Sequence, residues 1–208
     1  MALSPIDVEL LRNAMGSIAD EMYYALMKSA YSTNIKERHD HSATIFDGQG
    51  RVLVQGDSLP LHLASILGLV GIILDRFGPD DIHPGDMFIS NDPFVGRGSH
   101  LPDVALVAPV FHQGELAMFV GNIAHHADIG GMAPGSMAGG MTEIYQEGLR
   151  IPPIKLMRGD EIIKDVFDLI LLNVRVPHER RGDYAAQIAA NRLGVRRCGE
   201  LLERWSLA

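Results

Sequence analysis

The feature that most constrains this chain is a pair of apolar runs, Val104 to Phe111 and Leu116 to Ala124, separated by the polar turn His112-Gln113-Gly114-Glu115. Two such runs around a short glycine-containing turn predict an antiparallel β-hairpin. The open end of this hairpin leads into two polar, glycine-rich stretches, Asn91 to Asp103 and His125 to Thr142. Long stretches without regular structure in a compact domain are usually functional or disordered. We expect function here because both stretches carry His and Asp.

The open end of the hairpin would bring together side chains that are distant in the sequence. His100 and Asp103 lie just before the first strand, and His125 directly follows the second. Two imidazoles and a carboxylate are a suitable ligand set for a divalent transition metal, with positions left for water or substrate. A plainer interpretation stays open, because histidines in loops are commonly exposed to solvent or bonded to the backbone.

His126 and Asp128 follow at once and are the candidate catalytic residues. Spacing does not distinguish His126 from His125, so one ring can bind the metal while the other points elsewhere and acts as an acid or base. Asp128 fits three roles: a ligand, a partner that orients an imidazole, or a turn residue before Gly130.

A charged segment from Glu37 to His41 precedes the first hairpin of the chain. A third carboxylate, from Glu37 or Asp40, would complete an oxygen-richer site suited to manganese or iron. A solvated turn explains the same charges equally well.

The rest of the pattern predicts an α+β domain. Ser4-Pro5-Ile6-Asp7 has the residues of a helix start, and apolar residues then recur at helical spacing to about Ser29. The other expected elements are a hairpin over 43–47 and 51–55, a helix over 61–77, a strand over 87–90, and helices over 165–173 and 177–205. We therefore expect a single domain over residues 1–208, in which helices flank antiparallel hairpins and long glycine-rich loops hold the metal site.

Charge and hydropathy narrow the classes of partner. The formal net charge of -8 argues against nucleic acid and against anionic membrane surfaces. The longest apolar run, within Leu59 to Phe77, is interrupted by polar residues, and its unbroken part is well under the ~18 residues of a membrane span. The start of the chain lacks the pattern of a signal peptide, so we expect a cytoplasmic protein. The single cysteine, Cys198, excludes an intrachain disulfide.

Two common catalytic motifs do not occur. Gly96-Arg97-Gly98 is not followed by the Lys-Ser/Thr of a phosphate-binding loop, so we do not expect the chain to bind ATP by itself. Gly135-Ser136-Met137 lacks the nucleophile-elbow pattern, which disfavours a serine hydrolase.

The motifs together resemble the hydantoinase B family. The resemblance runs through nearly the whole chain, in the family's order: Glu37-Arg38 with Asp40, Phe46-Asp47, Pro60-Leu61-His62-Leu63, Pro84-Gly85-Asp86, Asn91-Asp92-Pro93, His100-Leu101-Pro102-Asp103, His125 to Gly131, Pro134-Gly135-Ser136, Thr142 to Pro153, Asn173-Val174-Arg175, and Gly182-Asp183 with Gln187 and Asn191.

This family includes B subunits of ATP-dependent N-methylhydantoinases, the corresponding half of 5-oxoprolinases, and acetone carboxylase alpha subunits. The resemblance implies a partner A-type subunit that binds ATP and phosphorylates the substrate. The B-type subunit then completes the opening of a cyclic amide or the carboxylation of a ketone. In the carboxylase branch a manganese ion is held by residues that match His100, Asp103 and His125, and a further glutamate ligand falls on Glu37.

Family members are more than twice as long as this chain, which implies a fragment, a truncated product or half of a split subunit. Two functions therefore stay open. One is the metal-binding subunit of an ATP-dependent hydrolase of hydantoin or 5-oxoproline type, with the carboxylase as an alternative within that class. The other is a non-catalytic scaffold stabilised by a metal. Manganese is the expected metal, with zinc or iron as alternatives, and the expected assembly is a hetero-oligomer.

Overall fold

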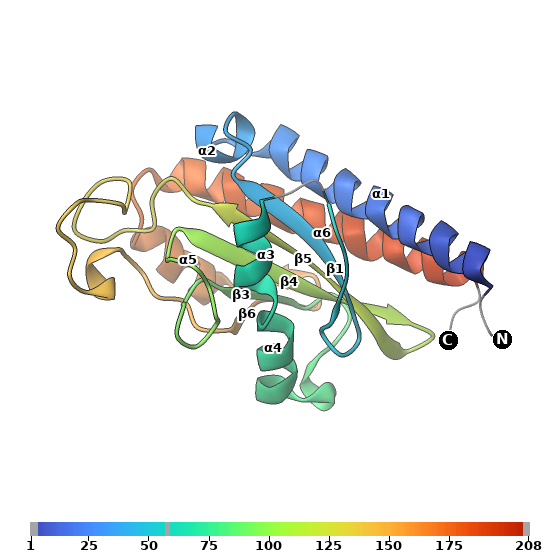
Figure 1. The fold of residues 1–208 in the computed structure, drawn as a ribbon. Coiled ribbons are helices and arrows are strands. Elements are labelled where there is room, and N and C mark those ends of the chain that lie inside the picture. Colours follow the sequence, from blue (N-terminus) through green and yellow to red (C-terminus); the bar gives the residue numbers. More distant parts are fainter. Residues whose placement is uncertain (1–3, 57–58, 206–208) are drawn as a thin grey trace.

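The computed structural model describes residues 4–56 and 59–205, and within them one antiparallel sheet lies between two layers of helices (Figure 1). The strands are β1 (His41–Asp47), β2 (Val52–Gln55), β3 (Met87–Ser90), β4 (Asp103–His112), β5 (Glu115–His125), β6 (Ile154–Arg158) and β7 (Glu161–Ile162). They pair in the order β2-β1-β5-β4-β3-β6-β7. The expected α+β class is confirmed.

Two long helices cover one face of the sheet. They are α1 (Pro5–Ser29) and α6 (Pro177–Trp205), which lie side by side and antiparallel in Figure 1. The predicted start of α1 is confirmed, because Ser4 and Asp7 form a reciprocal capping box. The two helices approach closely where Gly194 faces Met22: a Cβ at Gly194 would lie 2.4 Å from the sulfur of Met22.

The opposite face carries α3 (Pro60–Ile66) and α4 (Leu69–Phe77), which are interrupted at residues 67–68. The sequence predicted one continuous helix here. It also considered only the unbroken part of the apolar run and not the mean hydropathy of the whole stretch. The 18-residue stretch Pro60–Phe77 has a mean hydropathy of 1.5, which by length and composition alone is enough for a membrane-crossing helix. A core helix meets the same criteria, and the inward side of α4 packs on the sheet through Leu69 and Ile73.

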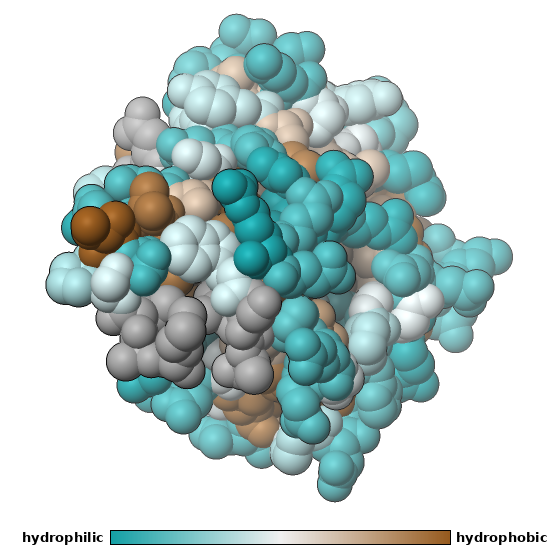
Figure 2. All heavy atoms as spheres, turned by 90° about the vertical axis from the view of Figure 1, so that its right-hand side faces the viewer, coloured by the Kyte–Doolittle hydropathy of each residue, from teal (hydrophilic) through white to brown (hydrophobic). Residues whose placement is uncertain are grey.

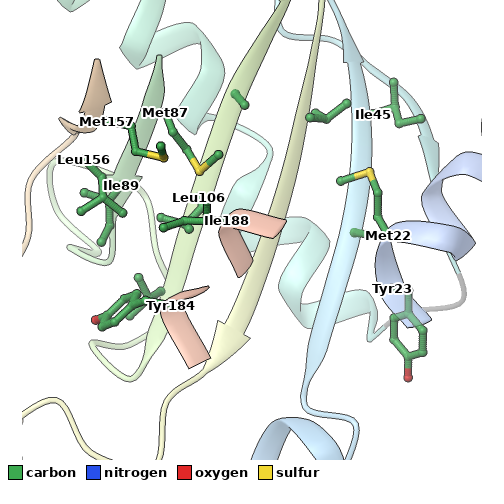
Figure 3. Close-up of a cluster of buried hydrophobic side chains, with 14 of the residues drawn as sticks. Met22, Tyr23, Ile45, Met87, Ile89, Leu106, Leu156, Met157, Tyr184 and Ile188 are labelled. Atoms are coloured by element: carbon green, nitrogen blue, oxygen red, sulfur yellow. The ribbon is translucent and has the colours of Figure 1, made fainter. Parts of the chain in front are cut away.

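Alternation along the strands sends successive side chains to the two layers. In β4, Val104 and Leu106 join the cluster with α1 and α6, whereas Ala105 and Val107 join the cluster with α3 and α4. Figure 3 shows the first cluster, in which Leu106 lies next to Ile188 of α6. Both faces of the sheet are therefore covered, which explains why the strands read as continuous apolar runs.

The predicted hairpins are both present, but they are not separate units. β1 pairs along its whole length with β5, so the first hairpin extends the sheet formed by the second. The sequence did not predict β6 and β7, nor the short helix α2 (Thr33–Lys36). The helices expected near the C-terminus are α5 (Lys164–Leu172) and α6, within one residue of their predicted starts.

The molecule has two different ends. The start of α1 and the end of α6 lie at one end, and Figure 2, which looks onto that end, shows a surface that is mostly hydrophilic. The loops over residues 91–102 and 126–143 lie at the other end, where β5 finishes (Figure 1). All the candidate site residues named from the sequence belong to that end.

Candidate metal centre

The centre of the site is the pair formed by the first residue of β4 and the last residue of β5. Asp103 and His125 are direct partners in the antiparallel register, as the predicted hairpin required. His100 precedes Asp103 by one turn of chain and lies over the same sheet end, since the Asp103 amide donates to the His100 carbonyl at 3.1 Å. The prediction that these three residues meet is confirmed.

Three ligand atoms from these residues form a small triangle. His100 Nε2 lies 2.8 Å and His125 Nδ1 lies 3.0 Å from Asp103 Oδ1, and the two ring nitrogens are 3.2 Å apart. Bonds of about 2.1 Å place neighbouring ligand atoms about 3.0 Å apart around a six-coordinate ion and about 3.4 Å apart around a four-coordinate one. The triangle therefore fits a single divalent cation without rearrangement of the chain.

Two further residues approach the triangle from neighbouring elements. His62 of α3 places Nε2 3.3 Å from Asp40 Oδ1 and 4.0 Å from Asp103 Oδ2, and Asp40 Oδ2 lies 3.9 Å from His125 Nδ1. The other nitrogen of His62 is 3.0 Å from the hydroxyl of Ser42 in β1. Four elements thus contribute polar groups to one end of one sheet face.

Glu37 and Asp40 were alternatives for the third carboxylate, and the structure places them differently. The side chain of Glu37 is exposed at the end of α2, and the triangle of ligand atoms does not include it. Asp40 instead faces the site and hydrogen bonds with His62. Sequence reasoning gave no role to His62, although a histidine within an otherwise apolar helix was a usable signal.

The site is open to solvent where Asp40 and His100 lie. The side chains of Asp103 and His62 are 2% and 3% exposed, whereas those of Asp40 and His100 are 32% and 33% exposed. A ligand in solution can therefore reach the triangle past Asp40 and His100, while its floor is closed by the sheet and by α3.

The electrostatics of the site favour an ionised Asp103. Burial alone would raise the pKa of Asp103, but hydrogen bonds with His100, His125 and Ser99 outweigh it and hold the pKa well below its usual range. The hydrogen bond that His100 donates to Asp103 is the largest cause of the raised pKa of His100. For Asp40, the hydrogen bond with His62 is the main cause of a lowered pKa. An anionic carboxylate flanked by imidazole nitrogens suits a bound cation.

His126 points away from the triangle, to the sheet face under α6. It is fully buried, its ring packs against Tyr184 with centroids 4.3 Å apart, and Nε2 lies 2.9 Å from Gln187 Oε1. The Nε2 of Gln187 already donates to Val104 O and Asn122 Oδ1, so its Oε1 accepts and His126 Nε2 carries the proton. Burial lowers the pKa of His126 to about 4, so the ring is neutral at pH 7.

The contact with Gln187 is the first step of a buried series that we call the amide ladder, consisting of Gln187, Asn122 and Asn191. Asn122 Nδ2 donates to Asn191 Oδ1 at 2.8 Å, and Asn191 Nδ2 donates to Leu106 O at 3.1 Å. Each donor along the ladder has its own acceptor, which locks α6 to β4 and β5. Gln187 and Asn191 were noted in the sequence only as part of the family resemblance.

Asp128 organises the glycine-rich loop. Its Oδ1 accepts from the amides of Gly130 and Arg175, and its Oδ2 accepts from the amide of Gly135 and from the Arg175 guanidinium. Both oxygens are thus engaged by the loop and by the segment before α6. Gly131 (φ +81°) passes so close to the chain at residues 146–147 that a Cβ there would lie 2.3 Å from Gln146 O. Of the roles open to Asp128, the turn-forming one matches its contacts.

A pocket of about 380 Å³ adjoins the triangle on its open side. It is lined by His100, Ser136, Met137, Ala138, Met141 and Glu147. The pocket lies between the glycine-rich loop over residues 126–143 and His100, so a molecule bound there would lie next to the triangle.

Comparison with known proteins identifies the family of the chain. The family model described as hydantoinase B/oxoprolinase matches residues 4–208. The chain is 36% identical to caprolactamase subunit beta of Pseudomonas jessenii over 205 residues, 99% of this chain and 35% of that protein. It is 34% identical to the 5-oxoprolinase of Dictyostelium discoideum over 205 residues, again 99% of this chain but 16% of that protein.

Solved structures show the same fold. The crystal structure of the ATP-dependent caprolactamase from Pseudomonas jessenii matches with a TM-score of 0.92 at 36% identity, over 100% of this chain and 35% of that one. Acetone carboxylase matches with a TM-score of 0.90 at 22% identity, over 97% and 26% of the two chains, which shows the fold alone. This chain thus spans about a third or less of these proteins, and on the family match it belongs to the hydantoinase B/oxoprolinase family.

Proposed function

We propose that this chain is the metal-binding part of a subunit of an ATP-dependent hydrolase that opens cyclic amides of hydantoin or 5-oxoproline type. The observation that carries the proposal is the convergence of His100, Asp103 and His125, with His100 also lining a pocket. Its relatives include a caprolactamase subunit and a 5-oxoprolinase, both named for the opening of a cyclic amide.

His100, Asp103 and His125 would hold the metal, with Asp40 as the nearest further carboxylate. The mixed nitrogen and oxygen donors suit manganese, zinc or iron, and we favour manganese. A bound divalent cation supplies Lewis-acid polarisation of a carbonyl and lowers the pKa of bound water. The chain itself contributes placement: His62 orients the Asp40 carboxylate, and Asp103 fixes both imidazoles.

The two candidate catalytic residues, His126 and Asp128, lie outside the pocket lining, and we propose positioning roles for them. His126 anchors the end of β5 through its amide, which donates to Pro102 O at 2.8 Å, and through the amide ladder. Asp128 fixes the loop whose next residues line the pocket. Proton transfer to and from the substrate then falls to a group at the open side that does not belong to the triangle, such as Asp40.

We also propose that ATP is used by a partner A-type subunit, in a hetero-oligomer. The related caprolactamase protein is named as a beta subunit, and its crystal structure is described as that of an ATP-dependent enzyme. Because such an assembly would use ATP, we propose that it works in the cytoplasm.

The first test is elemental analysis of the purified chain beside the double variant His100→Ala/His125→Ala. We expect about one equivalent of manganese, zinc or iron in the wild-type chain and almost none in the variant. The matched control is His83→Ala/His178→Ala, which removes two exposed histidines and should keep the metal. Equal metal contents in the wild type and the first variant would refute the site.

A second test asks whether the site is catalytic. The chain would be combined with an A-type partner and the remaining portion of the subunit, and ATP-dependent ring opening would be measured. Full activity of His100→Ala would rule out the hydrolytic role. Metal binding without ring opening in any combination would instead favour a metal-stabilised scaffold.

A further inference from the structure

A second pocket, of about 360 Å³, lies on the other face of the sheet, where α6 crosses it. Its lining includes Met87, Ala108, Met157, Arg192, Val195 and Arg196. Ala108 belongs to the cluster with α1 and α6, and it lies five residues along β4 from Asp103. At a rise of about 3.4 Å per residue, roughly 17 Å of strand separates this pocket from the metal triangle, which lies on the opposite face. A ligand in this pocket would therefore not belong to the candidate metal centre.

The rim of the pocket contains the Pro-Gly-Asp motif at residues 84–86, to which the metal centre gives no role. Asp86 is buried, with Oδ2 3.0 Å from Lys155 Nζ and Oδ1 3.3 Å from an amide of the turn before β7. Gly85 (φ +83°) passes so close to that turn that a Cβ there would lie 2.5 Å from the amide nitrogen of Asp160. The motif thus holds two turns together, and both oxygens of Asp86 are already engaged.

The floor of the pocket is apolar. Met87 and Met157 are direct partners in the pairing of β3 with β6, and they lie side by side in Figure 3. Ala108 leaves space above β4 because its side chain ends at Cβ, and Val195 lines the pocket from α6. Methionine side chains adapt to apolar groups of different shape. The floor therefore suits the aliphatic part of a ligand.

Two arginines of α6 line the same pocket without a close anionic partner. Arg192 Nη2 donates to the carbonyl oxygen of Asp160 at 2.8 Å, but its Nε is 3.9 Å from the carboxylate of that residue. Arg196 Nε is 3.9 Å from Glu200 Oε1, and no hydrogen bond among the described residues engages its guanidinium. The exposed carboxylate of Asp160 balances at most one of the two positive charges.

The neighbouring Arg197 shows what a satisfied guanidinium looks like on this helix. Its Nε lies 2.9 Å from Glu21 Oε2, and its Nη1 lies 2.6 Å from Glu200 Oε2. Glu200 is therefore committed to Arg197 and not to Arg196. Arg192 and Arg196 are one helical turn apart, a spacing at which like charges repel each other. An anion bound by both would remove this repulsion.

We propose that this pocket binds a small organic carboxylate with an aliphatic chain. The carboxylate accepts from Arg192 and Arg196, and the chain lies on Met87 and Met157. Guanidinium groups match the two oxygens of a carboxylate in geometry, and a pocket of this volume accommodates small molecules. The site is independent of the proposed function, because the pocket and the triangle lie on opposite faces of the sheet.

The test uses hexanoate and three analogues: acetate lacks the aliphatic chain, 1-hexanol lacks the charge, and hexylammonium carries the opposite charge. Binding to the whole chain would be followed by NMR of the methionine methyl groups. We expect hexanoate to shift Met87 and Met157 and to bind at least about 10-fold more tightly than each analogue. Met137, in the pocket beside the triangle, reports binding at the metal centre. Unshifted signals of Met87 and Met157, or equal affinities for hexanoate and 1-hexanol, would overturn the proposal.

Variants isolate the role of the two arginines. Arg192→Gln/Arg196→Gln should weaken hexanoate at least about 10-fold and leave 1-hexanol unchanged. Arg196→Lys, which keeps the charge but loses the planar group, should retain part of the affinity. Arg12→Gln removes an exposed arginine of α1 and is the matched control, which should behave as wild type. Thermal unfolding of each variant verifies that folded chains are compared, and undiminished binding of hexanoate by the folded double variant would refute the assignment.

Discussion

His125 and His126 are neighbours in sequence, yet they belong to two polar regions that differ in almost every respect. His125 lies in the metal triangle on the α3 side of the sheet, and His126 begins the amide ladder on the α6 side. In the ladder each donor has its own acceptor. In the triangle, two imidazole nitrogens approach the same oxygen of Asp103 and also approach each other.

This difference separates a structural polar network from a binding site. A buried network stabilises a fold when each of its donors has an acceptor. In the triangle, three ligand atoms converge on one point at an open surface and two nitrogens share one oxygen. A bound cation would interact with all three atoms better than they interact with one another. The contrast predicts that the ladder governs folding and the triangle governs metal binding, and each prediction below tests that division.

The largest effect is expected from the ladder. Gln187→Leu would leave His126 Nε2 and Asn122 Oδ1 without the hydrogen-bond partner they have in the interior, and it would remove the bond from Gln187 Nε2 to Val104 O. We expect the free energy of unfolding to fall by about 4 kcal/mol. Urea denaturation of the metal-free chain measures this. Gln49→Leu, at an exposed turn, is the control, and a change below about 1 kcal/mol for Gln187→Leu would contradict the structural role.

The next effect is expected at the triangle. Asp103→Ala removes the oxygen that both imidazoles contact, so metal affinity should fall at least about 100-fold, or about 3 kcal/mol. Competition with a chromophoric chelator measures the affinity. Tight metal binding by Asp103→Ala would show that the triangle is not the metal site. Gln187→Leu, where it remains folded, should keep its metal, which makes it the reciprocal control.

The buried histidine of the ladder should make stability depend on pH. The pKa of His126 is lowered by burial from 6.5 to about 4, so between these values the unfolded chain binds a proton that the folded chain does not. Its contribution therefore weakens stability as the pH falls from 6.5 towards 4, by roughly 2 to 3 kcal/mol, and has no effect above 6.5. Denaturation curves between pH 4 and 7 for the wild type and His126→Asn measure this, and parallel curves would contradict it.

The smallest effect concerns the choice between two carboxylates. Asp40→Asn should weaken metal binding about 10-fold, because Asp40 faces His62 and His125 at the site. Glu37→Gln should leave the affinity unchanged within about twofold. The same chelator competition compares the two variants. A larger loss for Glu37→Gln would restore the residue that the family resemblance favoured.

Local sequence patterns predicted much of this fold because local physics decides those parts. The capping box of α1, the turn of the β4–β5 hairpin and the strand at residues 87–90 depend on residues within a few positions of one another. The hairpin register alone placed Asp103 opposite His125. The β6–β7 pair was missed because its residues follow the long loop without a strong alternating pattern.

The sequence by itself determined an antiparallel hairpin whose open end joins His100, Asp103 and His125. Only the tertiary structure decided that Asp40 and His62 complete this site, because β1 must pair with β5 and α3 must pack over that end of the sheet. The tertiary structure also decided that His125 faces the triangle and that His126 faces the amide ladder on the other side of the sheet. Helices cover both faces of the sheet, so the residues of β5 that point to either face are mostly apolar. The sequence pattern of β5 therefore does not tell which histidine faces which layer of helices.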